Sequence, residues 1–248
     1  MKKVLTKNRT QVINKFNKKK FNFRKIFLDH FKAFKVRDLE NLHNIIPKKY
    51  IPNNLIKSKN SQKPEIYKYL YKIDKAYDLK KKRKPSKFFK TYNKFVKHLS
   101  KNVFKETLIY QERPTLRVMF PNNVAVSEFH RDSDSNYNHP VEENNVWVPL
   151  TSSLNSNTIW MESKYNKKNY KPVNLNYGQY LIFDSGLKHG NVINKEEKTR
   201  LSFDFRVIPY SVWIKMKRKD KKSSYNTKLK FDIGGYYNII HLKKKSKI

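Results

Sequence analysis

Two side chains that can bind a metal ion lie two positions apart in the segment Phe129-His130-Arg131-Asp132. In an extended segment, residues i and i+2 point to the same side, so the imidazole of His130 and the carboxylate of Asp132 can reach one ion. His189, just after a predicted strand, is a candidate third ligand. Two histidines and one carboxylate with open positions on the metal are typical of non-haem Fe(II) oxygenases. A lone His-x-Asp pair is more often an ordinary surface feature, so the hypothesis depends on the residues that accompany it.

A second polar group begins eleven positions after His189, on a predicted strand. One face of this strand would carry Arg200, Ser202, Asp204 and Arg206, and the other Leu201, Phe203, Phe205 and Val207. Buried guanidinium groups need an anionic partner, and a bound dicarboxylate would supply one through bidentate hydrogen bonds. The alternative, which the sequence leaves open, is that the two arginines pair with Asp204 or Asp184.

These residues resemble the motifs of the Fe(II)/2-oxoglutarate-dependent dioxygenases, which combine His-x-Asp, a distal His and a later Arg-x-Ser on a double-stranded β-helix. Within that superfamily, the chain resembles the StrG-like branch of streptomycin biosynthesis. The closer similarity is carried by residues 128–134, 147–151, 160–163 and 199–206. It covers residues 115–213 and does not explain the basic first hundred residues.

The resemblance implies a role for each matched position. His130, Asp132 and His189 would bind Fe(II), while Arg200 and Ser202 would hold the distal carboxylate of the co-substrate 2-oxoglutarate. It also implies an oxidoreductase that hydroxylates its substrate with formation of succinate and CO2. We expect that substrate to be a small polar molecule, such as a sugar, an amino acid or a guanidino compound.

Further polar residues on predicted strands are candidates for substrate contacts, because polar groups on the inward faces of barrel strands line a pocket. They are Arg117, Asn145, Trp147 and Arg206. For Arg206, an ion pair within the protein is as good an explanation as a substrate contact. For Trp147 and Trp160, a position in the hydrophobic core is the better explanation. We expect His139 to lie in a loop or to support a ligand through a hydrogen bond rather than to bind the metal.

The elements that must position these residues are predicted from hydrophobic periodicity. Short β-type runs occupy residues 115–120, 145–150, 158–162, 179–183 and 200–208. A helix is expected over residues 23–42, and another over 85–102, where Ser86 or Pro85 would start it. The apolar stripe of the second helix consists of Phe88, Tyr92, Phe95 and Leu99. This order predicts an α+β fold: a double-stranded β-helix, or cupin-like jelly roll, with N-terminal helices packed on one sheet.

Composition divides the chain into four segments. We expect a disordered basic arm over residues 1–20, a Lys-rich helical extension over 21–105, the jelly-roll catalytic core over 106–212 and a basic extension over 213–248. In the last segment, an apolar patch at residues 231–242 could add a strand, and residues 243–248 resemble a solvated tail.

The formal net charge of +36 is carried by the flanks, since residues 106–212 contain 12 basic and 12 acidic side chains. Only 10 of the 56 basic residues are Arg, a bias that an AT-rich genome would also produce. A nucleic-acid partner bound by the flanks is therefore considered but not favoured. The absence of cysteine excludes disulfides and thiolate metal sites. With no apolar stretch of spanning length, we expect a cytoplasmic protein without a membrane partner.

Three other functions compete with hydroxylation of a small molecule. A dioxygenase acting on nucleic acid or protein would bind its polymer with a steep salt dependence. A catalytically silent cupin-like binding module would have no chemical reason to keep all three metal-binding residues together with Arg200 and Ser202. A cupin enzyme that works without a keto acid would keep the metal ligands but would not need those last two residues.

Overall fold

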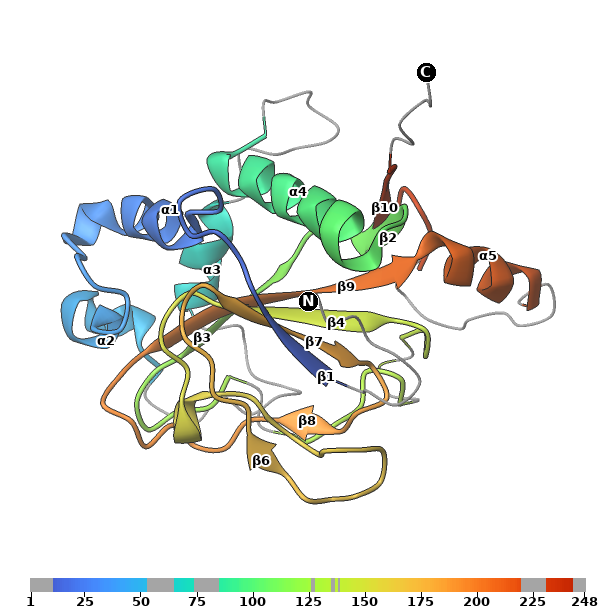
Figure 1. Cartoon of the computed structure of the whole chain (residues 1–248). Helices are drawn as coiled ribbons and strands as arrows, with labels where there is room; N and C mark the ends of the chain where they lie inside the picture. Colours follow the sequence, from blue (N-terminus) through green and yellow to red (C-terminus); the bar gives the residue numbers. More distant parts are fainter. Residues whose placement is uncertain are drawn as a thin grey trace.

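The computed structural model describes residues 11–52, 65–73, 85–125, 128–134, 137, 139–219 and 231–242. Within this part of the chain, helices cover one face of a large antiparallel sheet, and a smaller antiparallel sheet lies on the other side (Figure 1). Helices and antiparallel sheets together confirm the predicted α+β class.

The large sheet contains seven strands among the described residues. In spatial order they are β1 (Gln11–Lys15), β7 (Gln179–Asp184), β4 (Asn144–Pro149), β9 (Arg200–Pro209), β2 (Leu108–Gln111) and β10 (Tyr237–Ile240), and β3 (Thr115–Met119) pairs with the first half of β9. The small sheet consists of β6 (Lys171–Pro172), β5 (Trp160–Met161) and β8 (His189–Gly190). All five predicted strands are present, as β3, β4, β5, β7 and β9.

The helical elements lie mainly in the first half of the chain. They are α1 (Phe23–His30), η1 (Lys32–Phe34), α2 (Leu42–Ile45), η2 (Lys48–Tyr50), α3 (Glu65–Leu70), η3 (Tyr71–Ile73), α4 (Lys87–Leu99), the π-helical turn η5 (Ser100–Phe104), η6 (Asn155–Asn157) and α5 (Tyr210–Lys219). Among the described residues, no helix is long and apolar enough to cross a membrane.

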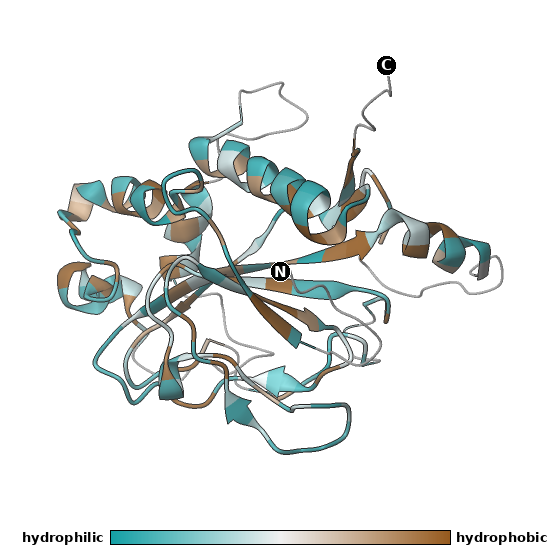
Figure 2. Ribbon diagram, in the orientation of Figure 1, coloured by the Kyte–Doolittle hydropathy of each residue, from teal (hydrophilic) through white to brown (hydrophobic). Residues whose placement is uncertain are grey.

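Helix α4 begins and packs as its sequence predicts. The Ser86 hydroxyl accepts a hydrogen bond from the backbone N–H of Phe89 at 3.1 Å, which satisfies one of the free donors of the first turn. The predicted apolar stripe is buried. In Figure 2, the polar residues of α4 face away from the large sheet. The amphipathic pattern therefore fixes which side of the helix contacts the strands.

Strand β9 separates two environments, as its alternating sequence predicted. Its odd-numbered apolar residues, Leu201, Phe203, Phe205 and Val207, belong to the main core beneath the helices. Arg200, Asp204 and Arg206 point to the opposite side and line a cavity. The period of two along one strand thus builds both the core and the wall of the candidate site.

Aromatic rings fill the space between the helices and the large sheet. Phe95 of α4 contacts Phe23 of α1 edge to face, with ring centroids 5.7 Å apart, and Phe23 contacts Phe203 of β9 at 4.9 Å. Each such pair contributes about 0.5–1.5 kcal/mol beyond its buried area. The helices therefore pack on the face of β9 that is turned away from the cavity.

The prediction of one helix over residues 23–42 was wrong. Helix α1 ends at His30, and after η1 the chain enters a left-handed turn at Lys35, whose φ is 58°. The chain then folds back, so that Arg24 pairs with Asp38 at 2.7 Å and with Glu40 at 2.5 Å. These ion pairs stabilise the reversal of the chain after α1, which the near-helical spacing of apolar residues did not indicate.

The prediction of a disordered arm was wrong for residues 11–20. Strand β1 pairs with β7 from Gln11 opposite Phe183 to Lys15 opposite Gln179. Val12 and Phe16 are buried. Two scattered apolar residues are therefore enough to order this segment when the edge of a sheet supplies hydrogen-bond partners for its backbone. Residues 1–10 lie outside the described part.

The C-terminal segment adds a strand to the sheet. The patch expected at residues 231–242 contains β10, whose residues Tyr237 to Ile240 pair with Gln111 to Leu108 of β2. Helix α5 crosses the boundary predicted at residue 212. The division into four segments remains a prediction, and the expected tail at residues 243–248 lies outside the described residues.

Candidate metal centre

The two candidate histidine ligands are neighbours across an isolated antiparallel bridge. The backbone N–H of His130 donates to the carbonyl of His189, and the reverse bond is also made, both at 2.9 Å. His189 also belongs to β8, where it lies opposite Met161 of β5. Residues 59 positions apart are thereby joined by the backbone itself, independently of their side chains.

A glycine makes this close approach feasible. A Cβ atom at Gly190 would lie 3.0 Å from the Cα of Phe129 and 3.1 Å from the carbonyl oxygen of Glu128. Both of those atoms are backbone, so they cannot move aside as a flexible side chain would. Gly190 therefore allows the segment before His130 to lie against β8.

Each imidazole is oriented by a backbone carbonyl. Nδ1 of His130 lies 3.0 Å from the carbonyl oxygen of Glu128, and Nδ1 of His189 lies 2.9 Å from that of Leu187. A carbonyl only accepts hydrogen bonds, so Nδ1 carries the proton in both rings. The unprotonated Nε2 atoms remain available to a metal ion.

The two oxygens of Asp132 have different surroundings. Oδ2 accepts hydrogen bonds from Nδ2 of Asn145 and from Nη2 of Arg206, both at 2.9 Å. Oδ1 lies 3.5 Å from Nε2 of His130. One ligand atom from each of His130, Asp132 and His189 lies within 4.8 Å of the other two. Because these donors converge and one carboxylate oxygen is free, the residues fit a 2-His-1-carboxylate metal site.

Burial and nearby charges place these side chains in the protonation states that metal binding requires. Burial lowers the pKa of His189 to about 4, so its ring is neutral at neutral pH. Burial alone would raise the pKa of Asp132, but the nearby Arg206 guanidinium, together with the His130 side chain, outweighs it and holds the pKa well below its usual value. Asp132 is therefore ionised and His189 is an electron-pair donor.

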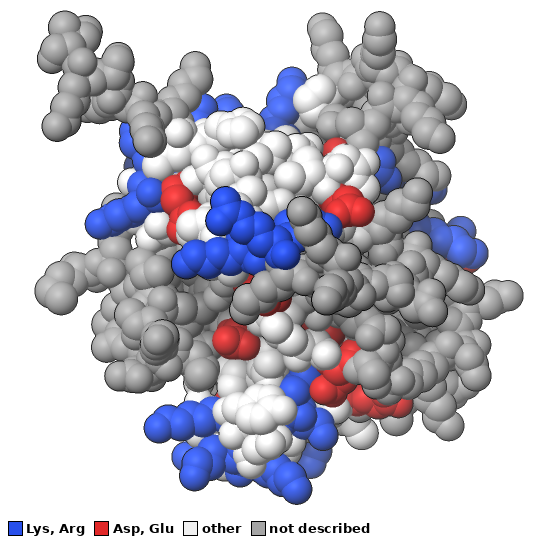
Figure 3. All heavy atoms as spheres, turned by 90° about the vertical axis from the view of Figure 1, so that its right-hand side faces the viewer, with Lys and Arg blue, Asp and Glu red and all other residues white. Residues whose placement is uncertain are grey.

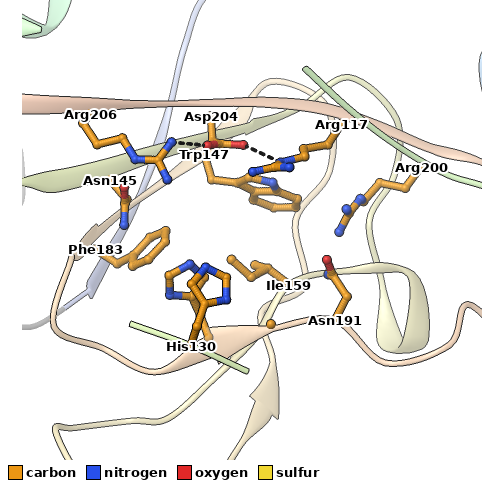
Figure 4. A pocket seen from close by; sticks show the side chains of 12 residues that line it. Arg117, His130, Asn145, Trp147, Ile159, Phe183, Asn191, Arg200, Asp204 and Arg206 are labelled. Atoms are coloured by element: carbon orange, nitrogen blue, oxygen red, sulfur yellow. Dashed lines mark hydrogen bonds and ion pairs between the residues drawn. The ribbon is translucent and has the colours of Figure 1, made fainter. Parts of the chain in front are cut away.

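A cavity that is partly open to solvent lies next to the histidines (Figure 4). Its lining residues are Arg117, His130, Asn145, Trp147, Ile159, Phe183, His189, Gly190, Asn191, Arg200, Asp204 and Arg206. In Figure 4, Arg206, Asp204 and Arg117 follow one another along one wall, and His130 lies on the opposite side. Polar groups that converge beside apolar side chains are typical of a site for a small organic molecule.

Arg200 is a buried cation without an anionic partner among the described residues. Its side chain is almost fully buried, its Nε has no hydrogen-bond partner, and its guanidinium carbon lies 5.8 Å from the ring centroid of Trp147. Burial lowers the pKa of Arg200 to about 10. The sequence left open that Arg200 pairs with Asp204 or Asp184. Among the described side chains, Arg200 forms neither of these ion pairs. A bound anion would supply the missing partner.

Ser202 lies on the same face of β9, between Arg200 and Asp204. Its side chain is fully buried, and its Oγ has no hydrogen-bond partner in the described part of the chain. It does not itself line the cavity. A buried hydroxyl without a partner is unfavourable, which is consistent with a hydrogen bond to something that binds there.

The other two arginines of the cavity are paired. Arg206 donates from Nη1 to Asp204 at 2.6 Å as well as from Nη2 to Asp132, so an ion pair does explain its burial. Burial would lower the pKa of Arg206, but the Asp132 carboxylate more than offsets this and raises it. Nε of Arg117 lies 3.3 Å from the second oxygen of Asp204. A line of alternating charges therefore leads from Arg117 to the candidate ligand Asp132.

All four residues predicted to contact substrate line the cavity. Asn145 and Arg206 also hold Asp132, a contact that the sequence analysis did not predict. Trp147 packs in the small core with Leu181 and Phe183 while it also lines the cavity. Their roles toward a substrate remain predictions.

His139 supports the metal-binding segment from outside the cavity. Its backbone N–H donates to the carbonyl of Asp132 at 3.1 Å, and its Nδ1 lies 2.9 Å from Glu143. The buried Glu143 carboxylate also accepts a hydrogen bond from the hydroxyl of Tyr237. His139 is thus hydrogen-bonded to the segment of the candidate ligands; that it does not itself bind the metal remains a prediction.

The cavity includes residues that sequence reasoning missed: Ile159, Phe183, Gly190 and Asn191. For two of these residues, the sequence contains a pattern that could have predicted their place in the cavity. Phe183 follows the alternation of its strand, and Asn191 stands two positions after His189. Nothing in the sequence indicated that Ile159 reaches the cavity.

No protein-family model matches the chain. The chain is 38% identical over 137 residues to the streptomycin biosynthesis protein StrG of Streptomyces griseus. This match covers 54% of the chain and 62% of StrG, so the chain spans less than two thirds of that relative's length. The similarity confirms the resemblance to StrG that the motifs predicted.

The chain also aligns in part with several solved structures. CytC3 with Fe(II) and alpha-ketoglutarate is 13% identical, with a TM-score of 0.45 over 84% of this chain and 79% of that one. The non-heme alpha ketoglutarate dependent carbocyclase SnoK from nogalamycin biosynthesis is 9% identical, with a TM-score of 0.46 over 83% and 84%. EvdO2 from Micromonospora carbonacea is 13% identical, with a TM-score of 0.46 over 84% and 94%. Because these TM-scores lie below 0.5, the functional conclusions depend on the residues of this chain.

Proposed function

We propose that this chain is an Fe(II)- and 2-oxoglutarate-dependent dioxygenase that hydroxylates a small polar molecule, with formation of succinate and CO2. His130, Asp132 and His189 would hold the iron. Arg200 and Ser202 would bind the distal carboxylate of 2-oxoglutarate. The cavity beside the histidines would receive the substrate.

One observation carries the proposal: the cavity beside the candidate metal ligands also contains a buried, unpaired arginine. A buried guanidinium without an anion is unfavourable, and a serine hydroxyl lies two positions away on the same strand face. A dicarboxylate bound to the metal at one end would place its other carboxylate in this part of the cavity. An enzyme that uses the metal without a keto acid would have no need of either side chain.

The chain's own residues would orient the reactants and exclude water. When bound, the iron and 2-oxoglutarate supply the oxidising chemistry for hydroxylation. Asn145 and Arg206 keep Oδ2 of Asp132 occupied, so that Oδ1 faces the histidines. Trp147, Ile159 and Phe183 give the cavity an apolar part that limits access of water.

We also propose that the two sheets are those of a double-stranded β-helix. Three features support this assignment: both sheets are antiparallel, both contribute residues to the cavity, and the described helices lie mainly on the outer face of the larger one. His189 comes from the small sheet, while Arg200 and Arg206 come from the large one. The candidate site would then lie between the two sheets, where jelly-roll proteins enclose ligands.

A small molecule is favoured over a polymer as the substrate. The similarity to a protein named for streptomycin biosynthesis supports this choice. On the face seen in Figure 3, the described basic side chains form separate groups with acidic side chains between them. A nucleic acid would be better served by a continuous basic surface that leads to the cavity.

The test is an anaerobic titration of the purified protein with Fe(II) and 2-oxoglutarate, monitored by the weak visible metal-to-ligand charge-transfer band. We expect the wild type to form the band, His130→Ala to lose it and Arg200→Ala to need much more 2-oxoglutarate. His241→Ala and Arg113→Ala are matched controls because both side chains are exposed and lie outside the cavity. They should behave as the wild type.

Other results would favour the competing functions. A folded, iron-loaded wild type without the band would point to a cupin enzyme without a keto acid or to a silent binding module. A band followed by steeply salt-dependent binding of an oligonucleotide at the site would favour a polymer substrate.

A further inference from the structure

The line of alternating charges in the cavity has a buried end and an open end. It runs from Asp132 through Arg206 and Asp204 to Arg117, with ion pairs of 2.9, 2.6 and 3.3 Å. The exposed fraction of these side chains rises along it, from 3% and 9% to 14% and 31%. Arg117 is therefore the most exposed member of the line, and it lies on the wall opposite His130 (Figure 4).

Charge balance leaves Arg117 as the cation without a full partner. Asp204 is shared, and its shorter contact is with Arg206. If Fe(II) and 2-oxoglutarate bind as proposed, their charges cancel each other, and so do the charges of the four side chains of the line. Arg200 then leaves the site with one net positive charge, and this charge is least neutralised at Arg117, whose ion pair is the longest of the line. An anionic group on the substrate would neutralise it.

The guanidinium of Arg117 is also held in a fixed orientation. Its Nε is taken by Asp204, and neither terminal nitrogen donates to any residue that the structure describes. On β3, Arg117 lies opposite Ser202 of β9, so it projects from the same face of the sheet as the cavity arginines. A guanidinium whose two terminal nitrogens are both free suits a carboxylate or a phosphate, which accept two parallel hydrogen bonds.

We infer that the substrate of this site carries an oxyanion, a carboxylate or a phosphate, and that Arg117 binds it opposite the metal. This inference rests on the proposed function and narrows its substrate class from small polar molecules to small anions. A purely structural role explains the residue less well, because Arg206 already forms shorter ion pairs with both Asp132 and Asp204.

The experiment uses the Mn(II)-loaded full chain saturated with 2-oxoglutarate. The ³¹P relaxation of inorganic phosphate and the ¹³C relaxation of acetate report whether either anion binds near the paramagnetic ion, and distant surface lysines do not contribute. We expect saturable relaxation enhancement by at least one anion. In Arg117→Gln its dissociation constant should be about tenfold higher or more, because a charged hydrogen-bonding partner is lost. Whichever of the two anions binds more tightly indicates a phosphate or a carboxylate as the natural group.

Two further variants separate charge from geometry. Arg117→Lys keeps the charge but lacks the fork, so it should recover only part of the affinity. Arg113→Gln removes the same charge from an exposed position outside the cavity and should bind both anions as the wild type does. Equal weakening by Arg117→Gln and Arg113→Gln would overturn the inference, since only net charge would then matter.

The anaerobic Fe(II) and 2-oxoglutarate titration distinguishes the two possible failures. If the wild type forms no charge-transfer band, the proposed function itself fails. If the band forms but neither anion shows relaxation enhancement by the metal, only the oxyanion inference fails. The same holds if Arg117→Gln does not change the binding of either anion. If Arg117→Gln weakens 2-oxoglutarate binding as much as Arg200→Ala does, Arg117 belongs to the co-substrate site, and the inference is also overturned.

Discussion

The helix-covered face of the large sheet is packed with aromatic rings, whereas the opposite face lines a polar cavity, although β9 contributes to both. The described residues contain six buried side-chain polar atoms without a hydrogen-bond partner. Four of them lie on the cavity side, in Asn145, Arg200, Ser202 and Arg206. A face that is optimised only for stability would not retain such groups.

Side chains that stabilise the fold and polar side chains that could bind a ligand therefore lie on opposite sides of one strand. Apolar burial and ring contacts on the helix side stabilise the fold, and they offset unsatisfied polar groups on the cavity side. Substitutions on the helix side should therefore change the free energy of unfolding. Substitutions on the cavity side should instead change the affinity for ligands.

The largest expected effect is on the helix side. Phe95→Ala removes a fully buried ring from the centre of the aromatic core and should lower the free energy of unfolding by about 3–5 kcal/mol. Guanidinium chloride unfolding followed by circular dichroism measures this change. Lys94→Ala, at the adjacent exposed position of α4, is the control and should change it by less than about 0.5 kcal/mol. A loss below about 1 kcal/mol for Phe95→Ala would contradict the assignment of this face to stability.

Arg200→Met should have opposite effects on the two properties. Loss of the guanidinium should weaken 2-oxoglutarate binding by about 2–4 kcal/mol, because a buried anion loses its partner. The free energy of unfolding of the ligand-free protein should stay the same or rise, since an unpaired buried charge is replaced by an apolar side chain. Calorimetric titration and chemical unfolding test the two halves separately. A large loss of stability would mean that Arg200 has a structural partner.

Glu40 provides a polar contact on the helix side with a predictable pH dependence. Burial alone would raise the pKa of Glu40, but hydrogen bonds from the Arg24 guanidinium and the Ser152 backbone N–H contribute to lowering it to about 2. Since the folded-state pKa is below the ordinary value of 4.5, the contribution is present above pH 4.5 and is lost as the pH falls toward 2. Glu40→Gln should lower the free energy of unfolding at pH 7 by about 1–3 kcal/mol.

The control for Glu40 is an exposed ion pair. Asp29 is 48% exposed and lies 3.4 Å from Lys25, so Asp29→Asn should change the free energy of unfolding by less than about 0.5 kcal/mol. In urea unfolding, the difference in the free energy of unfolding between wild type and Glu40→Gln should become smaller from pH 7 to pH 3. A difference that stays constant with pH would show that the carboxylate charge is not what stabilises this contact.

The smallest expected effect concerns the C-terminal strand. Tyr237 donates to the buried carboxylate of Glu143, and burial together with that carboxylate raises the pKa of Tyr237. Tyr237→Phe should lower the free energy of unfolding by about 1–2 kcal/mol, because Glu143 keeps His139 as a partner. Tyr165→Phe, at a position that is largely exposed, should leave it unchanged in the same thermal and chemical unfolding experiments. Equal effects of the two substitutions would mean that the Glu143 contact is not a stabilising one.

Much of the candidate site could be predicted because the deciding patterns are local. His-x-Asp in an extended segment and the alternation along β9 follow from the period of a strand, so they identified the ligand cluster and the polar face. Helix α4 followed from its spacing of apolar residues. The break after α1 was missed because Lys35 in a left-handed turn and the return to Arg24 leave no sign in a hydrophobic period.

The sequence by itself therefore determined which residues have the chemistry to bind a metal and which face of each strand they occupy. Only the tertiary structure decided that His130 and His189 are bridged through their backbones, that Gly190 permits this approach and that Arg206 reaches Asp132. It also decided that Arg200 has no anionic partner among the described residues while Arg206 has two. The reason is physical: side-chain chemistry and strand period are properties of a few consecutive residues, whereas partners 59 or 74 positions apart are set by register and packing.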